Sequence, residues 1–278
     1  MKKSGVLAII MVILFSSNLF SDNSVISDEI ISAIDNMQPV KYENVTIKGN
    51  LKFIDVQEKK VVSSSDSEST EYHCFVQVPV VFVDCIFAGD VVAYFNDEIK
   101  DEMYAAIFDE EVIFRNCTFE RDALFKYSEF HQDTDFTNNK FDGEALFKYS
   151  KFDTSVSFEN CSFYEDANFK YTKFRQTSFF GNSVFFDLAN FKYTKFEDLA
   201  DFSMVTFKDE ADFKYTKFPE GVTFENARFN NYANFKYVHF YEPFNMTGTE
   251  FKGNTDFKYT KLEDQDFSGK LSDDSGAY

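Results

Sequence analysis

Phenylalanine recurs along most of the chain at alternating steps of five and six residues. Between Phe114 and Leu262 this spacing defines 28 positions, and 26 of them are Phe; Met246 and Leu262 are the exceptions. An amphipathic helix needs apolar residues three and four apart, and a simple strand needs them two apart. Steps of five and six fit neither pattern. They predict a chain that turns a corner after every short strand.

Four such steps make a repeat of 22 residues, which contains the tripeptide Phe-Lys-Tyr seven times without insertion or deletion. The residue two places before each Phe is usually small, as in Ala123, Cys117 and Thr172. Residues two apart on a strand face the same side, so each short strand sends one small and one aromatic side chain inward. Four strands per repeat predict a rectangular coil, and successive coils stack about 4.8 Å apart as a parallel β-helix.

The repeat units resemble those of the pentapeptide-repeat family, in which a small residue, Asp or Asn, and then Leu or Phe precede two variable residues. The clearest matches are Ala167-Asn168-Phe169-Lys170-Tyr171, Ala189-Asn190-Phe191-Lys192-Tyr193 and Ala211-Asp212-Phe213-Lys214-Tyr215. The resemblance covers about residues 104–267 and implies an all-β fold, a right-handed quadrilateral parallel β-helix. The chain departs from the family pattern in using Phe rather than Leu and in having six residues in every second unit. We interpret the extra residue as a corner bulge that widens the coil around four phenyl rings.

The first 21 residues have the pattern of a secretory signal peptide. Lys2 and Lys3 precede an apolar run from Val6 to Phe15, and polar residues follow. The run is too short for a membrane-spanning helix, which needs about 20 apolar residues. We therefore expect cleavage after Ser21 and export to the periplasm, the cell surface or the medium. Membrane contact is expected only through an uncleaved N-terminus.

Residues 22–103 are expected to form an N-terminal cap with a short helix and irregular strands. A helix is predicted within residues 24–38, with Ser24 or Ser27 as its N-cap and Pro39 beyond its end, as a plug over the first coil. Strands are expected at 43–54 and 76–87, with a mobile loop at 55–72 between them. An excursion of ten residues is expected around 97–102, and residues 268–278 form a polar tail.

The formal net charge of −19 is concentrated in the N-terminal part. Residues 22–110 have 18 acidic and 6 basic residues, and residues 111–278 have 29 and 20. Such a charge disfavours nucleic acid and anionic membranes as partners.

The four cysteines do not have the spacing of a zinc site, and no metal or cofactor is expected. Cys117 and Cys161 occupy one coil position two coils apart, roughly 9–10 Å, which exceeds the reach of a disulfide. We expect both to be packing residues. Cys85 comes within bonding range of Cys117 if the ten-residue excursion is placed correctly, and Cys74 has no evident partner.

The Phe-Lys-Tyr units predict two outward rows of side chains along the rod, and a partial third row of lysines accompanies them. One hypothesis is a linear site for a repetitive polyanion, such as an anionic glycan or cell-wall polymer, with the Tyr rings as stacking platforms. The alternative is duplication of one unit, with Tyr stacking for stability and Lys protecting edges. The stripe consists of Lys126, Tyr127, Lys148, Tyr149, Lys170, Tyr171, Lys192, Tyr193, Lys214, Tyr215, Lys236, Tyr237, Lys258 and Tyr259, and the third row of Lys151, Lys173, Lys195, Lys217 and Lys261.

Two other function classes were weighed. An enzyme is disfavoured because His73, His131 and His239 share no row and no catalytic, metal-ligand or phosphate-loop pattern is present. The resemblance implies a second class, a DNA-mimicking protein that binds DNA gyrase; the expected export and the lysine stripe disfavour it.

The identity of a protein partner is left open. The resemblance also implies a homodimer through the C-terminal coil. Phe257, Leu262 and Phe267 lie near that end, where the sequence shows no evident plug.

Overall fold

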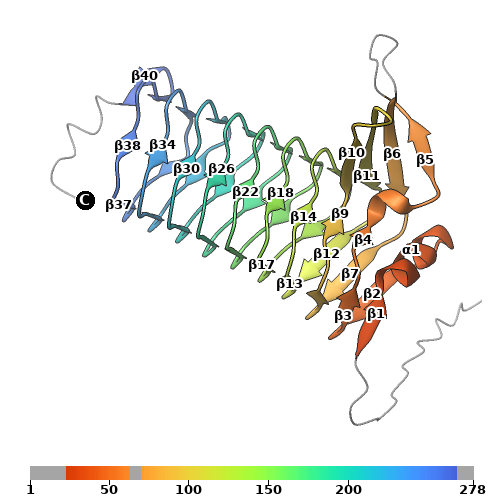
Figure 1. The fold of residues 1–278 in the computed structure, drawn as a ribbon. Helices are drawn as coiled ribbons and strands as arrows, with labels where there is room; N and C mark the ends of the chain where they lie inside the picture. Colours follow the sequence, from red (N-terminus) through yellow and green to blue (C-terminus); the bar gives the residue numbers. More distant parts are fainter. Residues whose placement is uncertain (1–22, 63–69, 268–278) are drawn as a thin grey trace, which may run out of the picture.

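The computed structural model describes residues 23–62 and 70–267. The predicted signal peptide, residues 1–21, and the predicted polar tail, residues 268–278, lie outside the described residues, and so do residues 63–69 of the predicted loop. The described chain forms an elongated rod, with the N-terminal coils at one end and the last repeat at the other (Figure 1).

Four sheets, which we name A to D, form the four sides of the rod, and almost all of their strands are parallel. This arrangement confirms the predicted quadrilateral parallel β-helix. Three pairs are antiparallel: β5 with β6, β10 with β11, and β39 with β40.

Sheet A contains β1 (Ser24–Ile26), β3 (Thr46–Lys48), β8 (Ile86–Phe87), β13 (Thr118–Phe119), β17 (Lys140–Phe141), β21 (Ser162–Phe163), β25 (Val184–Phe185), β29 (Thr206–Phe207), β33 (Arg228–Phe229) and β37 (Glu250–Phe251). Sheet B contains β2 (Val40–Glu43), β7 (Val80–Val83), β12 (Val112–Arg115), β16 (Thr134–Asp135), β20 (Val156–Ser157), β24 (Ser178–Phe179), β28 (Ala200–Asp201), β32 (Val222–Thr223) and β36 (Phe244–Asn245).

Sheet C contains β4 (Leu51–Lys52), β9 (Val91–Val92), β14 (Ala123–Leu124), β18 (Ala145–Leu146), β22 (Ala167–Asn168), β26 (Ala189–Asn190), β30 (Ala211–Asp212), β34 (Ala233–Asn234) and β38 (Thr255–Asp256). Sheet D contains β5 (Lys59–Val61), β6 (Thr70–Val76), β10 (Tyr94–Asp97), β11 (Glu102–Phe108), β15 (Glu129–Phe130), β19 (Lys151–Phe152), β23 (Lys173–Phe174), β27 (Lys195–Phe196), β31 (Lys217–Phe218), β35 (His239–Phe240), β39 (Lys261–Leu262) and β40 (Gln265–Asp266).

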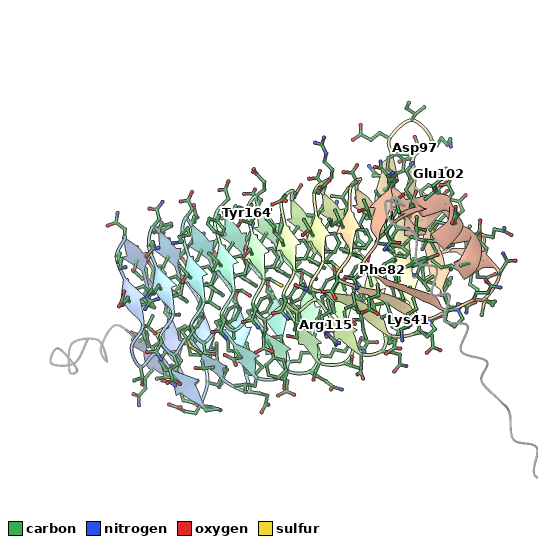
Figure 2. The ribbon with its side chains drawn as sticks, turned by 90° about the horizontal axis from the view of Figure 1, so that it is seen from below. Lys41, Phe82, Asp97, Glu102, Arg115 and Tyr164 are labelled. Carbon is green, nitrogen blue, oxygen red and sulfur yellow. The ribbon has the colours of Figure 1, made fainter. Side chains whose placement is uncertain are left out.

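Residues 22 apart are direct partners in neighbouring strands, as the sequence repeat predicts. Ala123 pairs with Ala145 in sheet C, and Phe130 pairs with Phe152 in sheet D. One earlier step is longer, because Ile86 pairs with Thr118, which is 32 residues on. The β10–β11 hairpin supplies the extra ten residues. This confirms the predicted excursion, and the hairpin projects from the rod with Asp97 and Glu102 at its two strand ends (Figure 2).

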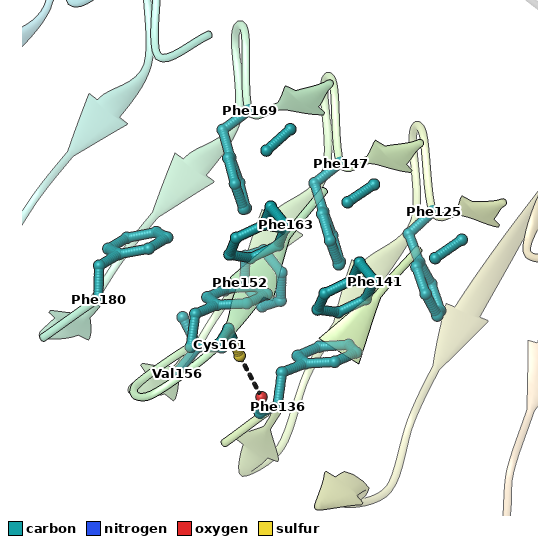
Figure 3. Packing of buried hydrophobic residues seen from close by; sticks show 14 of the residues in the cluster. Phe125, Phe136, Phe141, Phe147, Phe152, Val156, Cys161, Phe163, Phe169 and Phe180 are labelled. Atoms are coloured by element: carbon teal, nitrogen blue, oxygen red, sulfur yellow. Dashed lines mark hydrogen bonds between the residues drawn. The ribbon is translucent and has the colours of Figure 1, made fainter. Parts of the chain in front are cut away.

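Phenylalanine side chains fill the interior in four columns. Along each column the rings lie face to face; Phe147 and Phe169 have centroids 5.1 Å apart and planes at 1°. Across a coil the rings meet edge to face, as Phe147 and Phe158 do at 79° (Figure 3). Both arrangements are favourable for aromatic pairs. The small residues two places earlier are buried beside them, as predicted.

The coils have two kinds of corner. The five-residue steps contain a tight turn in which one residue has a positive φ, for example Tyr127 at 59° and Asn138 at 60°. The six-residue steps have three residues between the inward-facing ones, as at 131–133. The extra residue therefore lies at a corner, as we expected, and outside the core.

The N-terminal cap differs from the sequence prediction in several details. The helix α1 (Ser27–Asp35) begins after Ile26, and no side-chain hydrogen bond caps it, so the expected Ser cap is wrong. It does cover the first coil, with Ile30 and Ile34 buried. Residues 43–54 are not one strand. The chain turns at Asn44 and Gly49, which both have positive φ, and passes through β3, β4 and a 3-10 turn, η1 (Phe53–Asp55).

The regular architecture begins earlier than the expected boundary between residues 103 and 104. That boundary falls inside β11, and β2, β3 and β4 already occupy sheets B, A and C. The predicted mobile loop at 55–72 is also partly ordered, because β5 and the start of β6 pair as an antiparallel hairpin.

The C-terminal end has a plug that the sequence did not reveal. The strand β40 folds back on β39, and Phe267 becomes 4% exposed. Its ring packs against Phe240, Phe244 and Phe257. Phe251 and Phe257 remain half-buried at this end.

Candidate functional site

The Phe-Lys-Tyr units lie at the corner between sheets C and D. In each unit the residue after Tyr donates its backbone N–H to the carbonyl of Phe, as Thr194 does to Phe191 at 3.0 Å. An Asn or Asp one place before the Phe accepts the N–H of Lys in five units; Asn190 does so from Lys192 at 3.2 Å. These bonds explain why the three residues form a tight turn.

All seven tyrosines of the stripe occupy the left-handed backbone region, with φ between 59° and 64°. The diagonally opposite corner has the same conformation, but Asn occupies most of its positions, including Asn138 and Asn160. Asn tolerates this region better than Tyr does. Tyrosine is therefore used at this corner although a less strained residue is available.

Buried hydroxyl groups support the corner from inside. Ser or Thr follows most of the tyrosines, and its hydroxyl donates to the Phe carbonyl of the preceding coil at 2.6–2.8 Å. Thr194, for example, donates to Phe169. The sequence analysis identified this position only as a small inward residue. Its hydroxyl also holds successive Tyr corners in register.

The seven tyrosine rings form one continuous stack. Neighbouring centroids are 4.7–4.9 Å apart, and the planes are within 5° of parallel except for the last pair at 17°. Each inner ring therefore has both faces covered by other tyrosines. The expectation that these faces act as stacking platforms is wrong for the inner rings. Their edges and hydroxyl groups are what the surface presents.

Two rows of lysine flank the tyrosine stack. In the first row each Nζ lies 4.9–5.5 Å from the ring centroid of the following Tyr, within range of a cation–π interaction. The second row lies on the outward side of sheet D, at Lys151, Lys173, Lys195, Lys217 and Lys261. From residue 148 to residue 217, four consecutive coils have a lysine on each side of their tyrosine.

The two lysine rows differ in their ion pairs. In the second row, Lys151 contacts Glu129, and Lys173 contacts Glu197 at 2.9 Å. In the first row, no carboxylate of the described chain lies within ion-pair distance of Lys148, Lys170 or their neighbours. Partial burial and then the charges of Lys126 and Lys170 lower the pKa of Lys148. A bound anion would offset both effects.

An acidic row lies at the corner between sheets A and C, on the far side of sheet C. Burial, followed by the charges of Asp122 and Asp166, raises the pKa of Glu144. Burial and neighbouring carboxylates also raise the pKa of Asp166 and Glu210. The rod therefore has a basic edge and an acidic edge, which the net charge alone does not show.

The histidines do not assemble a catalytic site in the described chain. His73 pairs with Glu71 at 3.2 Å, His131 with Asp109 at 3.0 Å, and His239 contacts the Glu263 carbonyl. Residues 23–62 and 70–267 contain no cluster of His, Cys, Asp or Glu able to hold a metal ion. Within the same residues, no helix is long and apolar enough to span a membrane.

Comparison with known proteins identifies the repeat. A family model described as "Pentapeptide repeats (9 copies)" matches residues 104–151, 147–195 and 191–239. Searches of curated proteins and of solved structures found no significant match. The matched residues include five of the seven Phe-Lys-Tyr corners and part of a sixth, at residues 235–237, and the four-sided architecture is the one that the resemblance implied. The chain therefore belongs to the pentapeptide-repeat family.

Proposed function

We propose that this is a non-enzymatic structural or binding protein of the cell envelope or extracellular space, and that its lysine and tyrosine surface binds a linear polyanion. Pentapeptide-repeat proteins are generally structural or binding proteins. The observation that carries the proposal is the first lysine row, whose charges repeat once per coil with no carboxylate of the described chain in ion-pair distance.

The geometry favours a ligand that is itself repetitive. The coil repeat at this corner, measured between Tyr rings, is 4.7–4.9 Å, so cationic groups recur at that interval over seven coils. A chain with regularly spaced carboxylate, sulfate or phosphate groups could contact several lysines at once, whereas a small anion would contact one or two. The row of Tyr hydroxyl groups between the lysines can donate hydrogen bonds to the same anionic groups.

A site of this kind has a defined salt dependence. Each lysine that replaces a counterion on the polymer adds about 0.7–0.9 to the slope of log affinity against log salt, by analogy with nucleic-acid binding. Neutralising four lysines should therefore reduce that slope by about 3. The expected export is compatible with anionic glycans and wall polymers as ligands.

The test compares two variants of equal charge. One carries Lys→Gln at Lys148, Lys170, Lys192 and Lys214. The control carries Gln at Lys140, Lys208, Arg228 and Lys252, which are exposed and lie on sheet A or next to it. Binding to polygalacturonate and to polyglycerol phosphate is measured by calorimetry over a range of salt, with dextran as the neutral polymer.

We expect the stripe variant to lose at least tenfold in affinity while the control variant retains it. Equal losses in the two variants would mean that only net charge matters. No binding by the unaltered protein would favour duplication and stability as the origin of the stripe.

A second candidate is the gyrase-binding DNA mimic that the family resemblance implies, and the acidic row at Glu144, Asp166 and Glu210 favours it. The two candidates differ in cellular compartment. Cell fractionation and N-terminal sequencing distinguish them: a chain starting near Asp22 outside the cytoplasm supports the envelope role. An intact Met1 on a cytoplasmic chain would contradict export and call for a gyrase supercoiling assay.

A further inference from the structure

Cys85 and Cys117 occupy the same inner position of two successive coils. They directly precede the paired strands β8 and β13, in which Ile86 faces Thr118. The backbone N–H of Thr118 donates to the carbonyl of Cys85 at 2.9 Å, which confirms that the two coils are in register at this point. Neighbouring parallel strands have Cα atoms about 4.8 Å apart, inside the range of about 4.4–6.8 Å found for disulfides.

The two thiols are also directed toward each other. Both residues are 1% exposed and face the core at the corner between sheets B and A. Their thiols share a hydrogen bond, which lowers the pKa of Cys85 to about 7 and raises that of Cys117. The physical cause is that one thiol donates its proton to the thiolate of the other. Such a pair ionises once more easily than an isolated thiol, as in reactive dithiols.

We propose that Cys85 and Cys117 form a disulfide that joins the N-terminal coils to the first regular coil. The oxidant is a low-molecular-weight or protein disulfide. The Cys85 thiolate attacks one sulfur of the oxidant and releases a thiolate, and the deprotonated Cys117 then attacks the resulting mixed disulfide. Two cysteine thiols and one external disulfide become one intrachain disulfide and two external thiols.

The other two cysteines do not compete for this bond. Asn139 occupies the coil position between Cys117 and Cys161, and its side chain donates to the Phe114 carbonyl and accepts from the Cys117 N–H. Cys161 instead donates its S–H to the carbonyl of Phe136 at 2.9 Å (Figure 3). Cys74 lies in β6 on sheet D and donates to the carbonyl of Ile54.

The bond would close a loop that contains β9, the β10–β11 hairpin and β12. These elements make up the enlarged coil at the junction between the cap and the repeats, where the hairpin interrupts the 22-residue pattern. A cross-link there restricts the unfolded chain, and a loop of this length is expected to raise the unfolding midpoint by about 5–10 °C.

The test uses the full chain, reduced and unfolded, and then refolded in a glutathione redox buffer. Remaining thiols are alkylated, and the intact mass and a non-reducing peptide map are recorded. Matched single variants replace each cysteine by Ser. Ser suits this inner position, since Ser183 occupies it elsewhere and donates to the Phe158 carbonyl at 2.6 Å.

We expect two alkylated thiols, a mass about 2 Da lower than that of the reduced chain, and loss of the cross-link in Cys85→Ser and Cys117→Ser alone. Cys74→Ser and Cys161→Ser should still form it. Adding a reductant should lower the unfolding midpoint of the unaltered protein and of these two controls only. Four alkylated thiols after oxidative refolding, or a cross-link that includes Cys74 or Cys161, would overturn the proposal.

Discussion

The stacked phenylalanine core can be tested at Phe191, near the middle of the rod. Its side chain has no exposed surface, and its ring stacks on Phe169 and Phe213 with centroids 5.0 Å away on both sides. Phe180 and Phe202 also meet it edge to face at 5.3 and 5.2 Å. Replacing this side chain by Ala removes contacts in four directions at once.

The expected loss of stability for Phe191→Ala is about 3–5 kcal/mol. The value combines lost apolar burial with the cavity that remains, because the rings above and below are held in their own coils and cannot close it. Stacked and edge-to-face pairs add about 0.5–1.5 kcal/mol each beyond area, which places this site at the upper end of the range. Lys192→Ala is the adjacent control. It removes a half-exposed side chain over Tyr193 and should change stability by about 0.5 kcal/mol or less.

Urea unfolding measures both variants, with far-UV circular dichroism and tyrosine fluorescence as separate probes. Coincident transitions justify a two-state free energy, which a repeat protein does not always satisfy. Equal effects of the two substitutions would mean that the inside and outside of the coil have been assigned incorrectly. A loss below about 1 kcal/mol for Phe191→Ala would refute the cavity argument.

Three further predictions concern the corners and the end of the rod. Tyr193 has a φ of 60°, so Tyr193→Val should lower stability by about 1–3 kcal/mol relative to Tyr193→Asn, measured by urea unfolding; equal stabilities would contradict the strain argument. Because the pKa of Glu144 is raised in the folded state, stability falls as pH rises from the ordinary carboxyl range through the raised pKa. Glu144→Gln should therefore raise the thermal midpoint at pH 7, with a gain that shrinks as the pH falls; a constant gain would exclude this titration. Half-buried Phe251 and Phe257 at the last coil predict a homodimer, and light scattering at micromolar concentration tests it; a mass of one chain would remove the C-terminal dimer.

The interior of the rod was predictable because the repeat is exact. With a constant period of 22, every residue has its own counterpart as its neighbour, so one coil specifies the next. The inward direction of Phe and of the small residue follows from strand alternation alone. The positions of Cys117 and Cys161 followed from the same register.

The surface of the stripe was only partly predictable. The sequence places Lys and Tyr in rows, but the torsion angles at the corner decide how the rings lie. The left-handed φ of each Tyr places its ring against the next ring along the rod, which covers the faces and exposes the edges. Spacing along the chain contains no information about this orientation.

The sequence by itself determined the coil, its register and its aromatic core, since these depend on a short repeat and on the alternation of side chains. Only the tertiary structure decided the irregular ends: where the first coil begins, how β5 and β6 pair, how Phe267 closes the last coil, and that Cys85 lies against Cys117. At those places the insertions differ in length, so the neighbours of each residue are set by long-range pairing, which local sequence preference does not specify.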